Sequence, residues 1–143
     1  MYWYIKIADA KNKDFDKILL DVLIEKTIGI DFKIDRDYNS FSNVNEWNDY
    51  LDSKCSTRNQ YLALKRVFNT FINEIKVDDF VFLCSGSNKI HYICQVAGDY
   101  EFDRTFLHKY YSDTSLCHRR KIKNIVKFDA TAPKQMRCTI YRV

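Results

Sequence analysis

Positively charged side chains gather near the C-terminal end of the sequence. Residues 118–143 contain eight lysines and arginines and a single carboxylate. Polar and apolar residues alternate over residues 119–128, so Arg119, Lys121 and Lys123 are expected on one face of a strand. Such a row of cations suits an anionic partner such as nucleic acid, and an ordinary solvated basic surface is the alternative.

The charge is uneven along the chain, although its sum is small. Residues 1–56 hold 8 lysines and arginines against 11 acids, whereas residues 57–143 hold 15 against 8. The formal net charge is +4. A basic second half on an otherwise ordinary domain favours an anionic partner.

Length and composition are typical of one globular domain spanning residues 1–143. The chain is 46% hydrophobic and 15% aromatic, which supplies enough apolar surface for a core and excludes a disordered tail. No apolar run approaches the ~20 residues of a membrane span. No apolar segment follows a basic start, as it would in a signal peptide. We therefore expect a soluble cytoplasmic protein with no membrane partner.

The cysteines and histidines favour neither a metal site nor a disulfide framework. Five cysteines occur singly without a CxxC motif, and Cys117 next to His118 lacks further ligands at zinc-like spacing.

The sequence also lacks a nucleophile elbow, a P-loop and an HExxH motif. We expect reduced, packed thiols, no cofactor, and no catalytic activity in this chain.

Apolar residues at helical spacing predict two or three helices in the first half of the chain. A strand over Tyr2–Ile7 comes first, because its residues are aromatic and β-branched. The predicted helices run from a cap at Asp14 to about Lys26, from a cap at Ser42 or Asn43 through Leu51, and from a cap at Ser56 or Thr57 to about Ile75.

After Asp79 the apolar pattern changes to that of a sheet. The expected strands are Phe80–Cys84, Lys89–Ala97, Arg119–Phe128 and Met136–Val143, with a bend or bulge at Gly98. Ile122, Val126 and Phe128 are expected together on the face opposite the cations. The result is an α+β fold with a mostly antiparallel sheet that the first strand could join.

Two segments of the second half carry a resemblance to a known family. Residues 71–103 read FINEIKVDDFVFLCSGSNKIHYICQVAGDYEFD, and residues 118–128 read HRRKIKNIVKF. These segments are similar to the core of EVE-like domains of the PUA superfamily. The similarity is sharpest over Ile75–Phe80, Val96–Asp103 and His118–Phe128.

The sequence also departs from that family at defined positions. Asp78 stands where glycine is usual, and Phe128 stands where tryptophan is common. Residues 6–9 read Lys-Ile-Ala-Asp in place of the KSEP loop of stand-alone EVE proteins. The chain therefore more closely resembles the diverged EVE-like domains at the N-termini of McrB-type modification-dependent restriction proteins.

This resemblance implies a fold and a function. The fold would be a PUA/EVE-like pseudo-barrel of mostly antiparallel strands with two or three flanking helices. The function would be recognition of a modified base in DNA, such as 5-methylcytosine or a hydroxymethylated base, flipped into an aromatic pocket. The chain would then be the DNA-targeting module of a McrBC-type restriction or defence system. The motor GTPase and the nuclease would lie on another segment or subunit.

The resemblance and the charge pattern together suggest site residues. The expected base pocket consists of Trp47, Phe32, Tyr38, Asp31, Lys6 and Ser85. The expected phosphate-binding residues are Arg119, Arg120, Lys121, Lys123 and Arg58, although neighbouring side chains on a strand cannot all face one way. Core packing is the alternative for the aromatic residues, and simple solvation is the alternative for the charged ones.

Three other functions stay open at this point. A PUA-like domain could bind RNA without regard to modification. ASCH-type relatives include hydrolases, and Lys6 invites comparison with a small hydrolase acting on a modified nucleoside. A protein-interaction domain would need no nucleic acid at all.

Overall fold

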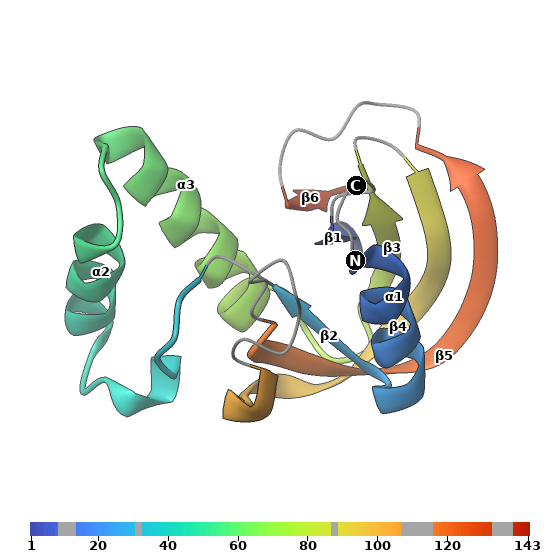
Figure 1. Ribbon diagram of the computed structural model, residues 1–143, viewed down its shortest axis with the longest axis horizontal. Helices are drawn as coiled ribbons and strands as arrows, with labels where there is room; N and C mark the ends of the chain where they lie inside the picture. Colours follow the sequence, from blue (N-terminus) through green and yellow to red (C-terminus); the bar gives the residue numbers. More distant parts are fainter. Residues whose placement is uncertain (9–13, 31–32, 87–88, 107–115, 133–138) are drawn as a thin grey trace.

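A computed structural model describes residues 1–8, 14–30, 33–86, 89–106, 116–132 and 139–143 (Figure 1). The fold is α+β, with a six-stranded mixed sheet in the order β2-β5-β4-β3-β1-β6. The strands are β1 (Tyr2–Ala8), β2 (Thr27–Ile30), β3 (Phe80–Ser85), β4 (Lys89–Phe102), β5 (His118–Thr131) and β6 (Ile140–Arg142). The α-helices are α1 (Phe15–Glu25), α2 (Val44–Ser53) and α3 (Arg58–Asn69). The sheet curls into a half-barrel, and α2 and α3 project from one end of it as a helical arm (Figure 1).

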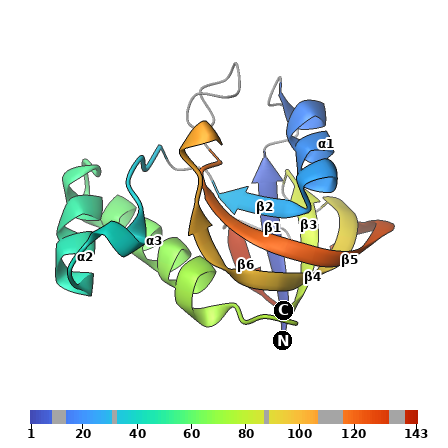
Figure 2. The same cartoon turned by 90° about the horizontal axis from the view of Figure 1, so that it is seen from below.

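The first strand joins the sheet between two strands from the second half of the chain. β1 runs parallel to β3, with Tyr4 opposite Phe82, and antiparallel to β6, with Tyr4 opposite Tyr141. All other strand pairs among the described residues are antiparallel. The ends of the described chain lie side by side (Figure 2), where the Val143 N–H donates to the Tyr2 carbonyl at 3.0 Å. The expectation that the first strand enters a mostly antiparallel sheet is confirmed.

Side-chain caps define the starts of both arm helices. The Asn43 side chain accepts a hydrogen bond from the Glu46 N–H, and the Thr57 side chain accepts one from the Gln60 N–H. The third predicted helix does not continue regularly to its expected end. After α3, residues Thr70–Glu74 form a π-helical turn, η2, and the chain becomes extended at Ile75. Two shorter 3-10 turns are η1 (Tyr38–Ser40) and η3 (Arg104–Phe106).

One large apolar cluster joins the sheet, α1 and the arm. Trp3 and Ile5 of β1, Val22 of α1 and Phe68 of α3 all belong to it, with at most 3% of each residue exposed. Because β1 is extended, its residues alternate between the two faces of the sheet. Trp3, Ile5 and Ile7 therefore face the core, and Tyr2 and Tyr4 face the other way. Within the described residues, no helix is long and apolar enough to cross a membrane.

A bulge in β5 reverses the expected placement of its apolar residues. Asn124 has a φ of 52°, and Asn124 and Ile125 of β5 there oppose the single residue Cys94 of β4. Ile122, before the bulge, is 3% exposed in the core, whereas Val126 and Phe128, after it, are 61% and 43% exposed. The prediction that these three share one face is therefore wrong, because the extra residue turns the strand over.

Replacing Gly29 of β2 by alanine is expected to lower the free energy of unfolding by about 1–3 kcal/mol. A Cβ there would lie 2.8 Å from the Leu116 carbonyl oxygen and 2.9 Å from the Leu116 Cβ. The first of these atoms is backbone, so relief requires a shift of the chain. Urea denaturation followed by circular dichroism measures the change.

Gly98→Ala is the matched control, because its new Cβ would meet nothing nearer than the Lys121 Cβ at 3.5 Å. That variant should change the free energy of unfolding by no more than ~0.5 kcal/mol. Equal losses in the two variants would contradict the steric explanation.

Candidate nucleic-acid interface

Arg120, expected to bind phosphate, is buried and bonded to the backbone. It is 2% exposed. Its Nε and Nη2 donate to the Gly98 carbonyl at 3.0 and 2.9 Å, and its Nη1 donates to the carbonyls of Phe71 and Ile75. These bonds fasten the end of η2 to the irregular stretch of β4 around Gly98.

Arg119 is likewise 2% exposed, and its side chain makes its contacts inside the fold. Its Nη1 donates to the Leu116 carbonyl at 2.9 Å, and its Nη2 donates to the Thr27 carbonyl at 3.4 Å. Its guanidinium carbon lies 3.6 Å from the centre of the Phe106 ring, a cation–π contact. The expectation that Arg119 and Arg120 bind phosphate is therefore wrong, because both guanidinium groups are used inside the fold.

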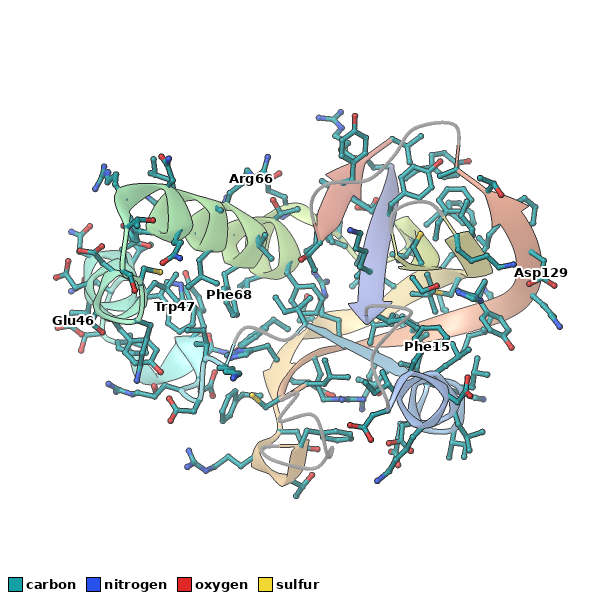
Figure 3. All side chains as sticks on the ribbon, turned by 45° about the horizontal axis from the view of Figure 1, so that its top comes forward. Phe15, Glu46, Trp47, Arg66, Phe68 and Asp129 are labelled. Carbon is teal, nitrogen blue, oxygen red and sulfur yellow. The ribbon has the colours of Figure 1, made fainter. Side chains whose placement is uncertain are left out.

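Trp47 is a core residue of the arm. It is 3% exposed, and it points toward Phe68 between α2 and α3 (Figure 3). Ring contacts surround it, with centroid distances of 5.3 Å to Tyr38, 5.4 Å to Phe41 and 5.4 Å to Phe68. The sequence correctly put Trp47 near Tyr38. The role of Trp47 as an open pocket wall is wrong, because other rings cover it.

A small cavity lies between the arm helices, lined in part by Tyr38, Trp47, Phe68 and Lys65. Its volume is about 50 Å³. Pockets for small-molecule ligands usually measure several hundred cubic ångströms, whereas about 10–15 Å³ suffices for one water. This cavity therefore has room for a few waters and not for a nucleotide.

His118 anchors the chain that follows β2. Its Nε2 donates to the Ile34 carbonyl at 2.7 Å, and its Nδ1 accepts from the Tyr100 hydroxyl at 2.7 Å. Burial lowers the pKa of His118 to about 4, so the ring is neutral at physiological pH. The Tyr100 oxygen also accepts from the Tyr38 N–H at 3.3 Å. His118 thereby ties the start of β5 to the chain around Ile34 and Tyr38.

Of the remaining predicted pocket residues, the structure describes Lys6 and Ser85, which lie on the adjacent strands β1 and β3. Asp31 and Phe32 lie outside the described residues, and their role stays a prediction. Ser85 ends β3, is 2% exposed, and lies with its Oγ 2.6 Å from the Nε2 of His91. A serine beside a histidine suits nucleophilic catalysis, but this hydroxyl is closed to a substrate.

Three of the predicted cations are on the surface. Lys121 and Lys123 are exposed on β5, and Lys123 forms an ion pair with Asp78. Arg58 is exposed at the start of α3, with its guanidinium carbon 5.4 Å from the Tyr61 ring centre. Arg58 therefore belongs to the arm, whereas the two lysines belong to the sheet.

Six aromatic rings gather on the side of the sheet that faces away from the main core. They come from β1, β3, β5 and β6, and we call their surface the ring face: Tyr2, Tyr4, Phe80, Phe82, Phe128 and Tyr141. Four of these residues are 36–49% exposed, and Tyr4 and Phe82 are partly buried beneath them. Isolated exposed rings are ordinary, but a contiguous group is typical of an interaction surface.

Strand register sets the order of the rings. Tyr141, Tyr4 and Phe82 are cross-strand neighbours, with centroids 6.4 and 5.0 Å apart, and Phe128 lies 6.3 Å beyond Phe82. Tyr2 and Phe80 form a second row, 5.2 Å apart and nearly parallel. Sequence reasoning missed this surface. The alternation of Tyr2, Tyr4 and Lys6 with buried residues was the available signal.

The exposed lysines flank the ring face. Phe80 of the second row lies opposite Gln95 on β4, and Gln95 lies opposite Lys123 on β5. Lys123 is therefore in line with the second row, two strands beyond Phe80. Lys121 shares that side of β5, because Ile122 between the two lysines points into the core. At the other margin, the partly exposed Lys6 follows Tyr4 by two residues on β1.

The profile of a protein family described as "Domain of unknown function (DUF8426)" matches residues 3–140. The chain belongs to the DUF8426 family. The matched residues of this DUF8426 chain include β2, β3, β4 and β5 entirely, all of β1 except Tyr2, and Ile140 of β6. No curated protein matches its sequence.

The ring face gives the DUF8426 chain a surface with two kinds of chemistry. Aromatic rings can stack on the flat faces of nucleobases, and lysines beside them can pair with phosphates. Among the described residues, the ring face is where exposed rings and exposed cations share one side of the sheet. Arg119, Arg120 and Trp47 are instead buried, and they stabilise the fold on which this surface lies.

Proposed function

We propose that this chain is a nucleic-acid-binding module that recognises a modified base, and that the base contacts the aromatic rings of the ring face. The observation that carries the proposal is the contiguous set of exposed rings with Lys121 and Lys123 on one side and Lys6 on the other. The basic second half of the chain favours the same class of partner.

The physical argument rests on base exposure. Extruding a base from a duplex costs a few kcal/mol, and least where pairing is already weakened. Stacking on an aromatic side chain returns ~1–3 kcal/mol per base. Lysines at the margin neutralise phosphates and add affinity that falls with salt. A ring face beside lysines therefore offsets the cost of exposing a methylated or hydroxymethylated base.

The resemblance to EVE-like domains of the PUA superfamily supports this proposal. The similar segments correspond to η2, β3, β4 and β5, which form much of the curled sheet. By that resemblance the chain is the targeting module of a McrBC-type restriction system. It would act with a motor GTPase and a nuclease carried elsewhere, and it would have no catalytic activity of its own.

Removing two lysines should weaken binding to all nucleic acids alike. In the double variant Lys121→Gln/Lys123→Gln, the slope of log affinity against log salt concentration should become shallower by up to ~2. The reason is that each phosphate contact contributes about 1 to the magnitude of this slope. Fluorescence anisotropy with labelled duplexes measures this, using 5-methylcytosine, 5-hydroxymethylcytosine and unmodified cytosine. The wild-type chain should bind a modified duplex more tightly than the unmodified one.

Lys54→Gln/Lys65→Gln is the matched control, because it removes the same charge from exposed positions on the arm. This variant should keep the wild-type salt slope. The proposal fails if no duplex or RNA binds, or if the arm variant flattens the slope as much as the sheet variant does.

A further inference from the structure

The ring face is longer than one extruded base requires. Tyr141 and Phe128 stand at opposite ends of the row that passes through Tyr4 and Phe82, and they are 39% and 43% exposed. A single base covers one or two neighbouring rings. One base on the centre of the row would therefore leave rings open at both ends.

The second row of rings extends the ring face along the direction of the strands. Tyr2 stacks on Phe80 and also lies 6.3 Å from Phe82, so the two rows form one continuous surface. Tyr2 is 49% exposed and Phe80 is 36% exposed. Sheet-based readers of single strands use two or three exposed aromatic side chains to stack two or three bases. The ring face offers at least that many.

Charge decides between a nucleic acid and a second copy of this chain as the occupant. The face carries three tyrosine hydroxyls and has lysines at its margins, namely Lys121 and Lys123 on one side and Lys6 on the other. A second copy would bring its own lysines together with Asp78, which forms an ion pair with Lys123, whereas a nucleic-acid strand brings a phosphate with every nucleotide. Rings also need the open faces of bases, which a paired duplex keeps stacked on one another.

We infer that the ring face binds a run of two or three consecutive unpaired nucleotides of one strand, stacked on its aromatic rings with phosphates at the flanking lysines. This inference rests on the proposed function and narrows its substrate to a single-stranded or locally melted target. A modified base would then be read within an opened stretch rather than as a lone flipped nucleotide.

A length series of labelled oligothymidylates tests the inference. Affinity should rise roughly five- to a hundredfold with each added nucleotide up to two or three, and then change little, because each stacked base contributes separately. An unmodified duplex with a three-nucleotide bubble should bind more tightly than the same duplex fully paired. Fluorescence anisotropy measures both comparisons.

Ring variants locate the binding. Phe128→Leu and Tyr141→Leu should each weaken the longer oligothymidylates roughly five- to a hundredfold, whereas Tyr141→Phe should retain wild-type affinity because it keeps the ring. Leu20→Ala, at a 55% exposed apolar residue of α1, is the control and should change nothing. Circular dichroism confirms that each variant is folded.

The outcomes separate this inference from the proposed function. If a modified duplex binds but affinity stops rising at one nucleotide, the inference fails and the function stands. If Phe128→Leu abolishes self-association in sedimentation experiments without changing oligonucleotide affinity, the face joins two copies and the inference also fails. If neither duplexes nor single strands bind, both fail.

Discussion

Replacing Arg120 by alanine is expected to lower the free energy of unfolding by about 3–5 kcal/mol. Four hydrogen bonds from this guanidinium reach three carbonyls: the bonds to Phe71 and Ile75 are buried, and the two to Gly98 are partly buried. Alanine would leave those oxygens without these donors, and each unsatisfied buried group costs about 1–3 kcal/mol. Chemical denaturation followed by circular dichroism measures the loss.

Arg120→Lys should lose most of the same stability. A lysine presents one compact ammonium instead of a planar fork, so it cannot reach oxygens on both η2 and β4. Lys121→Ala is the exposed control at the adjacent position, and it should change the free energy of unfolding by no more than ~0.5 kcal/mol. A loss below about 1 kcal/mol in Arg120→Ala would show that water or other side chains replace the guanidinium.

Replacing Trp47 by alanine should cost a similar amount, about 3–5 kcal/mol. The indole is 3% exposed and packs among the rings of Tyr38, Phe41 and Phe68, so its removal leaves a cavity where α2 meets α3. The melting temperature and the free energy of unfolding should both fall. Nucleic-acid affinity per folded molecule should stay near that of the wild type.

Val44→Ala on the same helix is the control for Trp47→Ala. Val44 is 52% exposed, and alanine is the better helix former, so this variant should be near neutral. A normal melting temperature in Trp47→Ala together with lost affinity for modified DNA would restore the pocket-wall interpretation from the sequence. That pair of results would contradict the core role that the burial of Trp47 indicates.

The helices of the arm could be predicted from the sequence because their signals are local. Each helix had two candidate caps, Ser42 or Asn43 and Ser56 or Thr57, and the second of each pair is the cap. The strand Tyr2–Ile7 could be predicted for the same reason, and it differs from β1 only in lacking Ala8. The π-helical turn after Asn69 has no comparable signal in the residue pattern.

The fate of the cations could not be predicted, because it depends on strand register and distant backbone. The alternation of residues along a strand predicts that Arg119, Lys121 and Lys123 share one face, yet Arg119 is buried and the two lysines are exposed. The reason is that backbone carbonyls at Thr27 and Leu116 receive its guanidinium. Nothing in residues 118–128 alone reports where those carbonyls lie.

The ring face escaped prediction for a related reason. Tyr2 and Phe80 stack on each other although they are 78 positions apart in the sequence, because β1 and β3 pair in parallel. Each strand alone shows one or two outward aromatic residues, which is unremarkable. Only the register between strands gathers them into a surface.

The position of β1 between β3 and β6 has a consequence for folding during synthesis. β1 is synthesised before both of its hydrogen-bonding neighbours, β3 near residue 80 and β6 near residue 140. While the ribosome is still producing the chain, β1 therefore waits with two open edges and a row of aromatic side chains, the arrangement most prone to aggregate. Such long-range pairing slows folding, so the two edges of β1 are covered late in the formation of the sheet.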